Sequence, residues 1–457
     1  MLDSSKYLGE EKITKLMLKF SIPCILSQLI SALYNIVDQM FIGNSELSTL
    51  GNAATGVVFP FFIIAQAFAW WFGDGCAAYL SMCQGSGNTE KADKCIGGGV
   101  TLTFLSSVFL VAVFFAFKKP MLLLFGASEN TIEYAIEYFN IVVAFFPVYM
   151  LANMMNSVTR ADGAPNVAML AMLLGAITNL ALDPLFIFTF KMGMSGAAWA
   201  TVIGQSVTFL VTFIYFFKTR TFKLKLSSFT LRSSALLSTV KIGLSTFVTQ
   251  LTIVVVTLLC NVLLSKYGSM SKYGADIPIA VVGIQSKIFT LIINVVVGIA
   301  LGSQPILSYN MGAKKYGRVK EVYLKTCASA IIIGLVSTLI IQLFPRAIIG
   351  IFGMPTNIPN PNDYWEFGEL VFRIFMSLVT FTCIVKVNSI FFQAAGKPVY
   401  AVLTSLIRDI ILFLPIVLIL TSVTGIYGII ISAPISDLLS FILALYLSIK
   451  FIKSLKE

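Results

Sequence analysis

The sequence predicts an all-α polytopic membrane protein with twelve transmembrane helices in two six-helix bundles. Three observations predict this class: charge is scarce, long apolar runs recur along the chain, and the second half repeats motifs of the first. Charged residues make up 12% of the 457 residues and hydrophobic residues 57%, whereas soluble proteins carry roughly 25% charged residues. A chain of this composition has too little polar surface to cover a water-soluble globule.

Apolar segments long enough to cross a bilayer recur twelve times. Each spanning helix needs about 20 mainly apolar residues, and breaks rich in Gly, Pro, Asn and charge separate the segments. The first one is too long for the apolar region of a signal peptide, so it is expected to remain as a helix. The predicted spans are residues 13–43, 52–83, 95–117, 131–158, 165–190, 195–217, 236–266, 278–309, 321–344, 364–394, 398–421 and 425–449.

The distribution of Lys and Arg predicts the orientation in the membrane. With a cytoplasmic N-terminus and twelve alternating spans, most of the 32 basic residues fall in cytoplasmic loops, as the positive-inside rule requires. A wrong number of spans would disperse this asymmetry. The sequence therefore predicts a cell-membrane protein with both termini in the cytoplasm. The net charge of +11 is then explained by the anionic inner leaflet rather than by nucleic-acid binding.

The composition also argues against most enzyme chemistry. The chain has no histidine, and its seven cysteines form no CxxC pair. Most zinc sites and acid–base or nucleophilic triads use His, so no metal centre, catalytic site or cofactor is expected. The phosphate-binding pattern GxxxxGK[ST] does not occur either, which argues against ATP hydrolysis and favours transport driven by an ion gradient.

An internal repeat divides the chain into two halves. Residues 124–127 (Leu-Phe-Gly-Ala) return as 351–354 (Ile-Phe-Gly-Met), 83–87 as 310–314, and the loop 160–165 as 393–398. Both halves hold six spans and begin on the same side, so we expect a pseudo-twofold axis along the membrane normal. The long polar stretch between them predicts an N-terminal lobe (1–217), a cytoplasmic linker (218–235) and a C-terminal lobe (236–457). Two such lobes can rock about a central cleft, as in secondary transporters.

Acidic and polar residues inside the first six spans are candidates for ion coupling, because burying a charge in a membrane is costly. At about 1.5 Å rise per residue, Asp38, Asp183 and Thr201 lie at one depth, roughly 8–10 Å from the outer end. Asn179 precedes Asp183 by four residues and shares its helix face. This group can share and release protons or bind a small cation. Alternatively, Asp183, which precedes Pro184, satisfies backbone groups freed at a broken helix.

The second half carries a different set of intramembrane charges. Lys386, Arg408, Asp409 and Asp437 lie close enough in depth to form ion pairs, which is the simpler reading, and a role in gating or substrate choice is the alternative. In the first half, Asp74 between two glycines is expected to cap or line the inner part of the cleft. The 38 Phe, 16 Tyr and 16 Met would suit a cleft for flat, apolar cations.

Several motifs resemble the multidrug and toxic compound extrusion family over essentially the whole chain. The similar segments are residues 23–28 (Pro-Cys-Ile-Leu-Ser-Gln), 34–38 (Tyr-Asn-Ile-Val-Asp), 41–43, 179–184 (Asn-Leu-Ala-Leu-Asp-Pro), 196–201, 302–306 and 393–398. The resemblance implies an antiporter that exports organic, mainly cationic, drugs and dyes in exchange for H⁺ or Na⁺ by rocking-lobe alternating access.

The resemblance also implies roles for single residues. In the branch of the Mep-type bacterial exporters, the positions that match Asp38, Asn179, Asp183 and Thr201 couple transport to the cation. Positions that match Tyr34, Tyr138, Asn156 and Met172 contact substrate in the cavity. Another branch uses acidic residues in spans 7 and 10. This sequence departs from that pattern, because span 7 has no acid and span 10 has Arg373 and Lys386 in its interior.

Two other functions stay open from the sequence. A lipid-linked oligosaccharide flippase could use a similar cleft, although the acids of the first half would repel an anionic substrate. A membrane scaffold without transport would leave the burial of Asp38 unexplained. Sequence does not distinguish H⁺ from Na⁺, and a monomer is expected because one two-lobed chain encloses its own cleft.

Overall fold

The structure is a computed structural model that describes residues 2–45, 48–274, 276–353 and 361–455. Within these ranges the chain is helical and contains no strand. Ten of the described helices are long and apolar enough to cross a membrane, and two bent helix pairs raise the number to twelve if each pair is one span. Every one of the twelve segments predicted from hydropathy coincides with one of these helices or pairs.

The first half of the chain forms six spanning units, two of them interrupted. The short 3₁₀ segment η1 (Leu2–Gly9) precedes them, and the helices are α1 (Ile13–Gly43), α2 (Ser48–Ser86), α3 (Thr89–Ala116), α4 (Lys118–Leu124), α5 (Ile132–Ala144), α6 (Phe146–Ala161), α7 (Pro165–Pro184) with the π-helical η2 (Leu185–Thr189), and α8 (Gly193–Phe216). The pair α5 and α6 is bent by 54°. The single predicted span 131–158 is therefore two helices that meet at an angle.

The second half repeats this order. After the 3₁₀ turn η3 (Leu226–Ser228) come α9 (Ser234–Ser269), α10 (Asp276–Gly312), α11 (Tyr316–Leu343), α12 (Pro345–Ile351), α13 (Pro361–Leu370), the π-helical η4 (Val371–Phe375), α14 (Val379–Ala394), α15 (Pro398–Leu406), the π-helical η5 (Ile407–Phe413), α16 (Leu414–Thr424) and α17 (Ile426–Ser454). The unit from α13 to α14 is bent by 48°. Each half thus contains one bent unit, fourth in its order.

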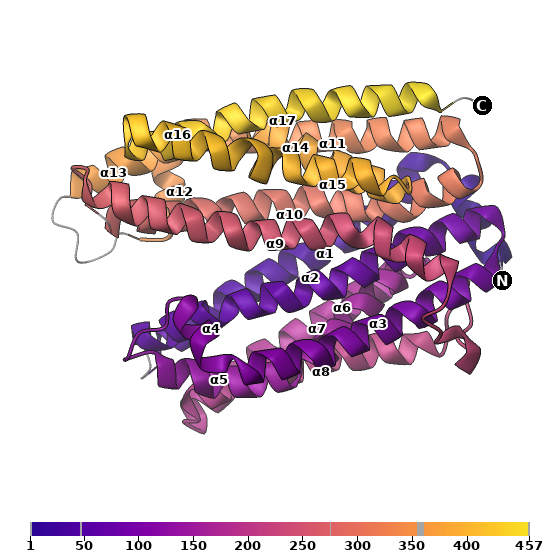
Figure 1. The fold of residues 1–457 in the computed structure, drawn as a ribbon, viewed down its shortest axis with the longest axis horizontal. Helices are drawn as coiled ribbons and strands as arrows, with labels where there is room; N and C mark the ends of the chain where they lie inside the picture. Colours follow the sequence, from indigo (N-terminus) through magenta and orange to yellow (C-terminus); the bar gives the residue numbers. More distant parts are fainter. Residues whose placement is uncertain (1, 46–47, 275, 354–360, 456–457) are drawn as a thin grey trace.

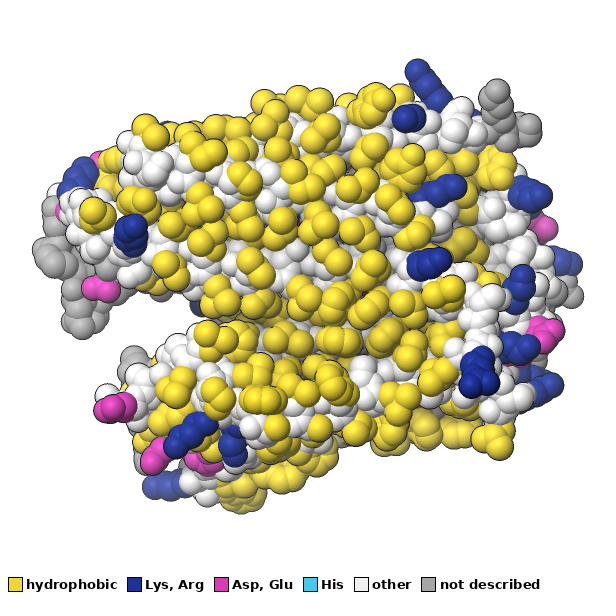
Figure 2. All heavy atoms as spheres, viewed as in Figure 1, with side chains coloured by type: hydrophobic (Ala, Val, Ile, Leu, Met, Phe, Trp, Pro, Cys, Tyr) yellow, Lys and Arg dark blue, Asp and Glu magenta, His cyan; other side chains and the backbone are white. Residues whose placement is uncertain are grey.

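The helices form two bundles that lie side by side, α1 to α8 in one and α9 to α17 in the other (Figure 1). Both chain termini lie at the same end of the molecule, which we call the closed end, and the opposite end is the open end. Figure 2 shows hydrophobic side chains over the middle of the molecule, charged side chains toward both ends, and a hollow between the bundles at the open end. The predicted boundaries 1–217, 218–235 and 236–457 remain a prediction, although α8 ends and α9 begins on either side of that linker.

The two bundles meet mainly along three helix pairs, α2 against α9, α1 against α10, and α2 against α10. At the crossing of α2 and α9, a Cβ added to Gly243 would lie 1.8 Å from the carbonyl oxygen of Trp71. At the crossing of α1 and α10, a Cβ on Gly302 would lie 2.5 Å from Cα of Ser21. Only glycine allows backbone to approach backbone this closely. The repeat therefore produces two equivalent close crossings, which we call the glycine seam.

Side-chain contacts across the glycine seam lie mainly in the halves of the helices near the closed end. The indole Nε1 of Trp71 donates a hydrogen bond to the carbonyl of Val240 at 2.8 Å, and its ring lies 4.4 Å from that of Phe247. Ser21 donates to the carbonyl of Ile299 at 3.3 Å. The bundles are therefore joined at one end and separate toward the other.

The close crossing at Gly243 predicts that Gly243→Ala destabilises the conformation in which the bundles are joined at the closed end. The added methyl group has no space, and overpacking of this kind costs about 1–3 kcal/mol. Gly283→Ala is the matched control, because Gly283 lies in α10 with no atom within 4 Å of the added Cβ. Thermal unfolding, followed with a thiol-reactive dye that detects the free cysteines, should show a lower midpoint for Gly243→Ala only. Equal midpoints for the two variants would contradict the close crossing.

Candidate functional site

The polar residues predicted in the first bundle lie together toward the open end. Asp38 on α1, Asn179 and Asp183 on α7 and Thr201 on α8 are all buried, with Asp38 the most exposed at 9%. The carboxyl groups of Asp38 and Asp183 lie within hydrogen-bonding reach of each other. The amide of Asn179 donates to Oδ1 of Asp183 at 3.3 Å. A hydrogen bond between two carboxyl groups requires a proton on one of them, so two carboxyl groups this close can share one proton.

Three oxygens of this group have no hydrogen-bond partner among the described residues. They are Oδ1 of Asp38, Oδ1 of Asn179 and Oδ2 of Asp183. A buried polar atom without a partner is rare in native structures and calls for an explanation such as a bound ion or a functional role. Carboxylate and amide oxygens are the ligands that hard cations prefer. The arrangement can therefore hold a proton or a small cation.

The local backbone explains why Asp183 lies where it does. Helix α7 ends at Pro184, and the wider turn of η2 follows directly. Proline cannot donate the helical hydrogen bond, and π-helical turns inside spans are frequent at functional sites. The alternative that Asp183 merely caps freed backbone groups finds little support, because one of its oxygens bonds Asn179 and the other has no partner.

Two of the four predicted cavity residues border the acid pair. The hydroxyl of Tyr34 accepts a hydrogen bond from the amide of Gln205 at 3.3 Å. The hydroxyl of Tyr138 reaches the side chain of Thr201. Met172 is partly buried on α7, two turns before Asn179 and on the same helix face. A role of these side chains in binding substrate stays a prediction.

The fourth cavity residue, Asn156, belongs to a different cluster. Its amide donates to the carbonyl of Ala168 at 2.9 Å, and its Oδ1 accepts from Arg160 at 3.0 Å. Arg160 also contacts Asp74 at 3.5 Å, and Ser157 donates to the same carboxylate at 2.8 Å. The structure thus places Asn156 toward the closed end, away from Tyr34 and Tyr138.

The cluster around Asp74 continues across the glycine seam. The hydroxyl of Thr246, on α9 of the second bundle, bonds the Asp74 carboxylate. Gln393 on α14 donates in turn to Thr246 at 2.8 Å. Sequence reasoning placed Arg160 in a loop, whereas it lies in α6 with only 14% of its side chain exposed. The only sign of this pair in the sequence was that two charged residues, Asp74 and Arg160, lie in or near the cytoplasmic halves of two predicted spans.

An aromatic pocket beside Thr201 was not foreseen from the sequence. The ring of Phe62 lies 5.3 Å from that of Phe146 and 5.6 Å from that of Tyr149. The same pocket is lined by Phe145, Val142, Val148, Val202 and Gln205. Its members come from α2, α5, α6 and α8, and no local pattern marks them.

The four charges predicted in the second bundle form one network. Arg408 donates to Asp437 at 2.7 Å and to Asp409 at 2.5 Å. Lys386 lies 3.6 Å from the other oxygen of Asp409. The guanidinium of Arg408 also lies over the ring of Phe289 at 5.6 Å. Two bases face two acids, so the network is balanced in charge, unlike the acid pair of the first bundle.

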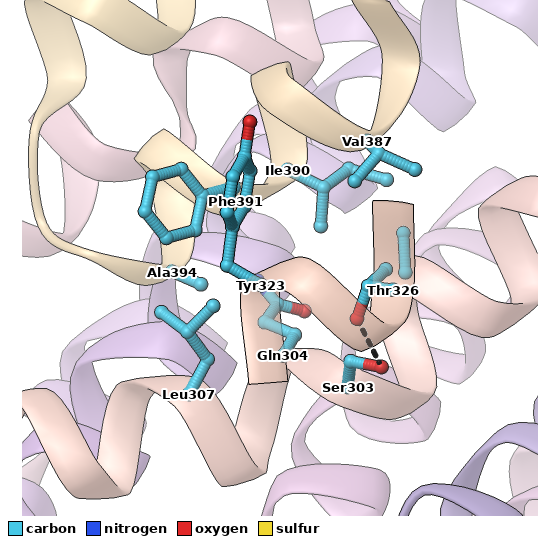
Figure 3. Close-up of a pocket in the computed structure, with 10 residues that line it drawn as sticks. Ser303, Gln304, Leu307, Tyr323, Thr326, Val387, Ile390, Phe391 and Ala394 are labelled. Atoms are coloured by element: carbon cyan, nitrogen blue, oxygen red, sulfur yellow. Dashed lines mark hydrogen bonds between the residues drawn. The ribbon is translucent and has the colours of Figure 1, made fainter. Parts of the chain in front are cut away.

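A small pocket in the second bundle has a mainly apolar lining with a few uncharged polar side chains (Figure 3). It lies between α10, α11 and α14, where Thr326 donates to Ser303 at 3.1 Å. The amide Nε2 of Gln304 has no partner among the described residues, and Tyr323 donates to Asn388 at 2.7 Å. Without a carboxylate, this pocket offers no second site comparable to the acid pair.

The comparison with protein families identifies the chain. The family model for MatE matches residues 23–185 and 245–419. The chain belongs to the MatE family. The two matched segments fall one in each half, which agrees with the internal repeat, and the resemblance inferred from the motifs is confirmed.

Relatives of this MatE-family chain include multidrug exporters. The multidrug export protein MepA of Staphylococcus aureus (strain MSSA476) is 25% identical over 447 residues, which cover 96% of this chain and 94% of that protein. Its counterpart in Staphylococcus haemolyticus is 25% identical over 450 residues, with the same coverage. Full-length MatE-family transporters are thus similar to the chain from end to end.

Solved structures share the fold of this MatE-family chain. An outward-facing multidrug resistance MATE family transporter of the MOP superfamily has a TM-score of 0.88 at 23% identity, and each chain is covered to 98%. A MOP superfamily transporter from Pyrococcus furiosus has a TM-score of 0.89 at 23% identity, with 99% and 98% covered. The predicted fold class of twelve helices in two bundles is confirmed.

The network in the second bundle predicts that Arg408→Gln is strongly destabilising. Removing one partner from a buried ion network typically costs about 3–5 kcal/mol, because the remaining charges stay buried. Arg373→Gln is the matched control, since Arg373 is 53% exposed and 3.9 Å from Glu369, and exposed pairs contribute about 0–1 kcal/mol. The midpoint of thermal unfolding should fall for Arg408→Gln alone. A similar midpoint for both variants would show that the network does not stabilise the bundle.

Proposed function

We propose that this MatE-family protein is a secondary antiporter that exports organic, mainly cationic compounds in exchange for H⁺ or Na⁺. The observation that carries the proposal is the acid pair Asp38 and Asp183, buried toward the open end with unpartnered oxygens. A buried acid pair without a basic partner is unfavourable unless it holds a proton or a cation. A transporter that is driven by an ion gradient needs such a site, because it must bind and release the ion in each cycle.

The coupling ion and the exported cation compete for the acid pair, and this competition couples the movement of one to that of the other. A bound proton or Na⁺ neutralises the pair, and an organic cation in the neighbouring cleft then gains less electrostatic attraction. Loss of the ion restores the negative charge and favours the organic cation. Binding of either cation removes the cost of the buried charge, so the state of the acid pair selects which cargo accompanies each change of conformation.

The side chains around the acid pair suit a broad range of organic cations. The rings of Tyr34 and Tyr138 border the carboxylates, and the aromatic pocket around Phe62 lies next to them. Aromatic faces attract cations and stack on flat ligands without demanding a particular hydrogen-bond pattern. Attraction of this kind depends on charge and apolarity, so it accepts many substrates.

Alternating access requires the two bundles to rock about their contact. In the structure they are joined by the glycine seam and separate at the open end (Figure 2). We assign the closed end, which carries the termini and most Lys and Arg, to the cytoplasm of the cell, as the positive-inside rule predicts. The hollow then opens to the outside, as expected for release of an exported compound and uptake of the coupling ion. One chain, acting as a monomer, contains the whole cleft.

Efflux should depend on Asp38. Cells that express the wild type should export ethidium, a fluorescent organic cation, and Asp38→Asn should reduce export to the level of cells without the protein, because the amide cannot exchange a proton. Asp276→Asn is the matched control, since Asp276 is an exposed acid at the start of α10. Expression in the membrane must be equal for all three. Normal export by Asp38→Asn would contradict the assignment of the coupling site.

The coupling ion can be identified in the same cells. Collapsing the proton gradient with a protonophore and the sodium gradient with a sodium ionophore, in turn, should stop export in one case only. Loss of export with the proton gradient assigns H⁺, and loss with the sodium gradient assigns Na⁺. Export that survives the removal of both gradients would refute secondary antiport.

A further inference from the structure

The N-terminal segment before the first span packs against both bundles at the closed end. Residues 5–11 comprise the end of η1 and the residues that lead to α1, and the side chain of Leu8 is 1% exposed. This segment packs on α2 of the first bundle and on α10 of the second. A short polar segment outside the membrane normally frays, so its burial here calls for an explanation.

Side chains of the second bundle donate hydrogen bonds to three backbone carbonyls of this segment. Arg318 on α11 donates to the carbonyl of Leu8 at 3.3 Å and to that of Glu11 at 2.6 Å. Asn310 at the end of α10 donates to the carbonyl of Leu8 at 3.0 Å, and Lys315 to that of Gly9 at 3.0 Å. Hydrogen bonds from charged donors are the stronger ones.

Arg318 is itself oriented by the second bundle. Its Nε donates to Oδ1 of Asn310 at 3.2 Å, which orients the guanidinium so that Nη2 donates to the segment. About two turns further along α11, the ammonium of Lys325 donates a hydrogen bond to the hydroxyl of Thr14, in the first turn of α1, at 2.8 Å. The second bundle therefore presents a row of donors to residues 8–14.

The other side of the segment contacts the first bundle. The hydroxyl of Tyr7 lies beside the turn between α6 and α7, where a Cβ on Gly163 would be 3.0 Å away from it. The ammonium of Lys19 on α1 lies 4.4 Å from the centre of the Tyr7 ring. Residues 5–11 thus bridge the two bundles at the end where the glycine seam joins them.

We propose that residues 5–11 form a strap that holds the closed end shut, and that Arg318 controls how often this end opens. Opening separates α1 from α10 and α2 from α9, so the strap must leave either Arg318 and its neighbours or the turn beside Tyr7. The donors of the second bundle therefore stabilise the conformation with the open end accessible. This inference rests on the alternating access of the proposed function, but on no choice of substrate or ion.

Hydrogen–deuterium exchange on the purified full-length chain in lipid nanodiscs tests the strap. The readout is the exchange rate of peptides from the glycine seam, residues 234–250 and 298–312, relative to peptides from α5 and α6. Breaking the strap should raise the population of the opened state, from which the seam amides exchange. The compared proteins are the wild type, Arg318→Gln, a chain without residues 2–9, and Lys91→Gln. Lys91 is exposed on α3, so its substitution removes one positive charge elsewhere.

Seam peptides should exchange about tenfold faster in Arg318→Gln and in the shortened chain, roughly the factor for loss of one hydrogen bond to a charged group. The α5 and α6 peptides and the Lys91→Gln protein should match the wild type. Wild-type seam exchange in both altered proteins would overturn the proposal. Equal acceleration of all peptides would also overturn it, because the strap would then support the fold rather than the gate. Neither result depends on whether the protein exports ethidium.

Discussion

The contact of backbone with backbone across the glycine seam is the constraint on which the rest of the structure depends. Without side chains at Gly243 and Gly302, α2 and α9, and α1 and α10, approach each other closely at one end. The bundles therefore join there and diverge toward the other end. The hollow, the aromatic pocket and the acid pair all lie on the diverging side or toward it. Because the contact is repeated by the pseudo-twofold relation, one geometry serves both crossings.

The two bundles differ in whether a buried pair of acidic residues has basic partners. In the second bundle, Arg408 and Lys386 pair with Asp409 and Asp437 in a balanced network, which needs no exchangeable ion. In the first bundle, Asp38 and Asp183 face each other without a base, and their free oxygens remain available. The repeat gives both halves the same order of helices, but among the described residues the buried acid pair without a base lies in the first half. This asymmetry supports the assignment of coupling to the first bundle.

Hydropathy and motif spacing predicted the spans, the repeat and the positions of Asp38, Asn179, Asp183 and Thr201, because these features depend on local sequence and on depth along a helix. The bend between α5 and α6 was missed, since the apolar run passes through it unchanged. Asn156 was grouped with Tyr34, yet it bonds Arg160. The rotation of each helix and the tertiary packing decide which side chains become hydrogen-bond partners, and neither can be read from a single sequence. The aromatic pocket was missed for the same reason, because its residues come from four helices.

The hollow at the open end also has a consequence for the surrounding lipid. A molecule whose halves diverge toward one side occupies more area in one leaflet than in the other. Rocking to the opposite conformation exchanges the larger and the smaller footprint. Any difference in lateral pressure between the leaflets then acts on the conformational equilibrium as a ligand would, through its unequal free energy in the two states. In the proposed transport cycle, the composition of the membrane is thus a third influence, besides the ion and the exported compound.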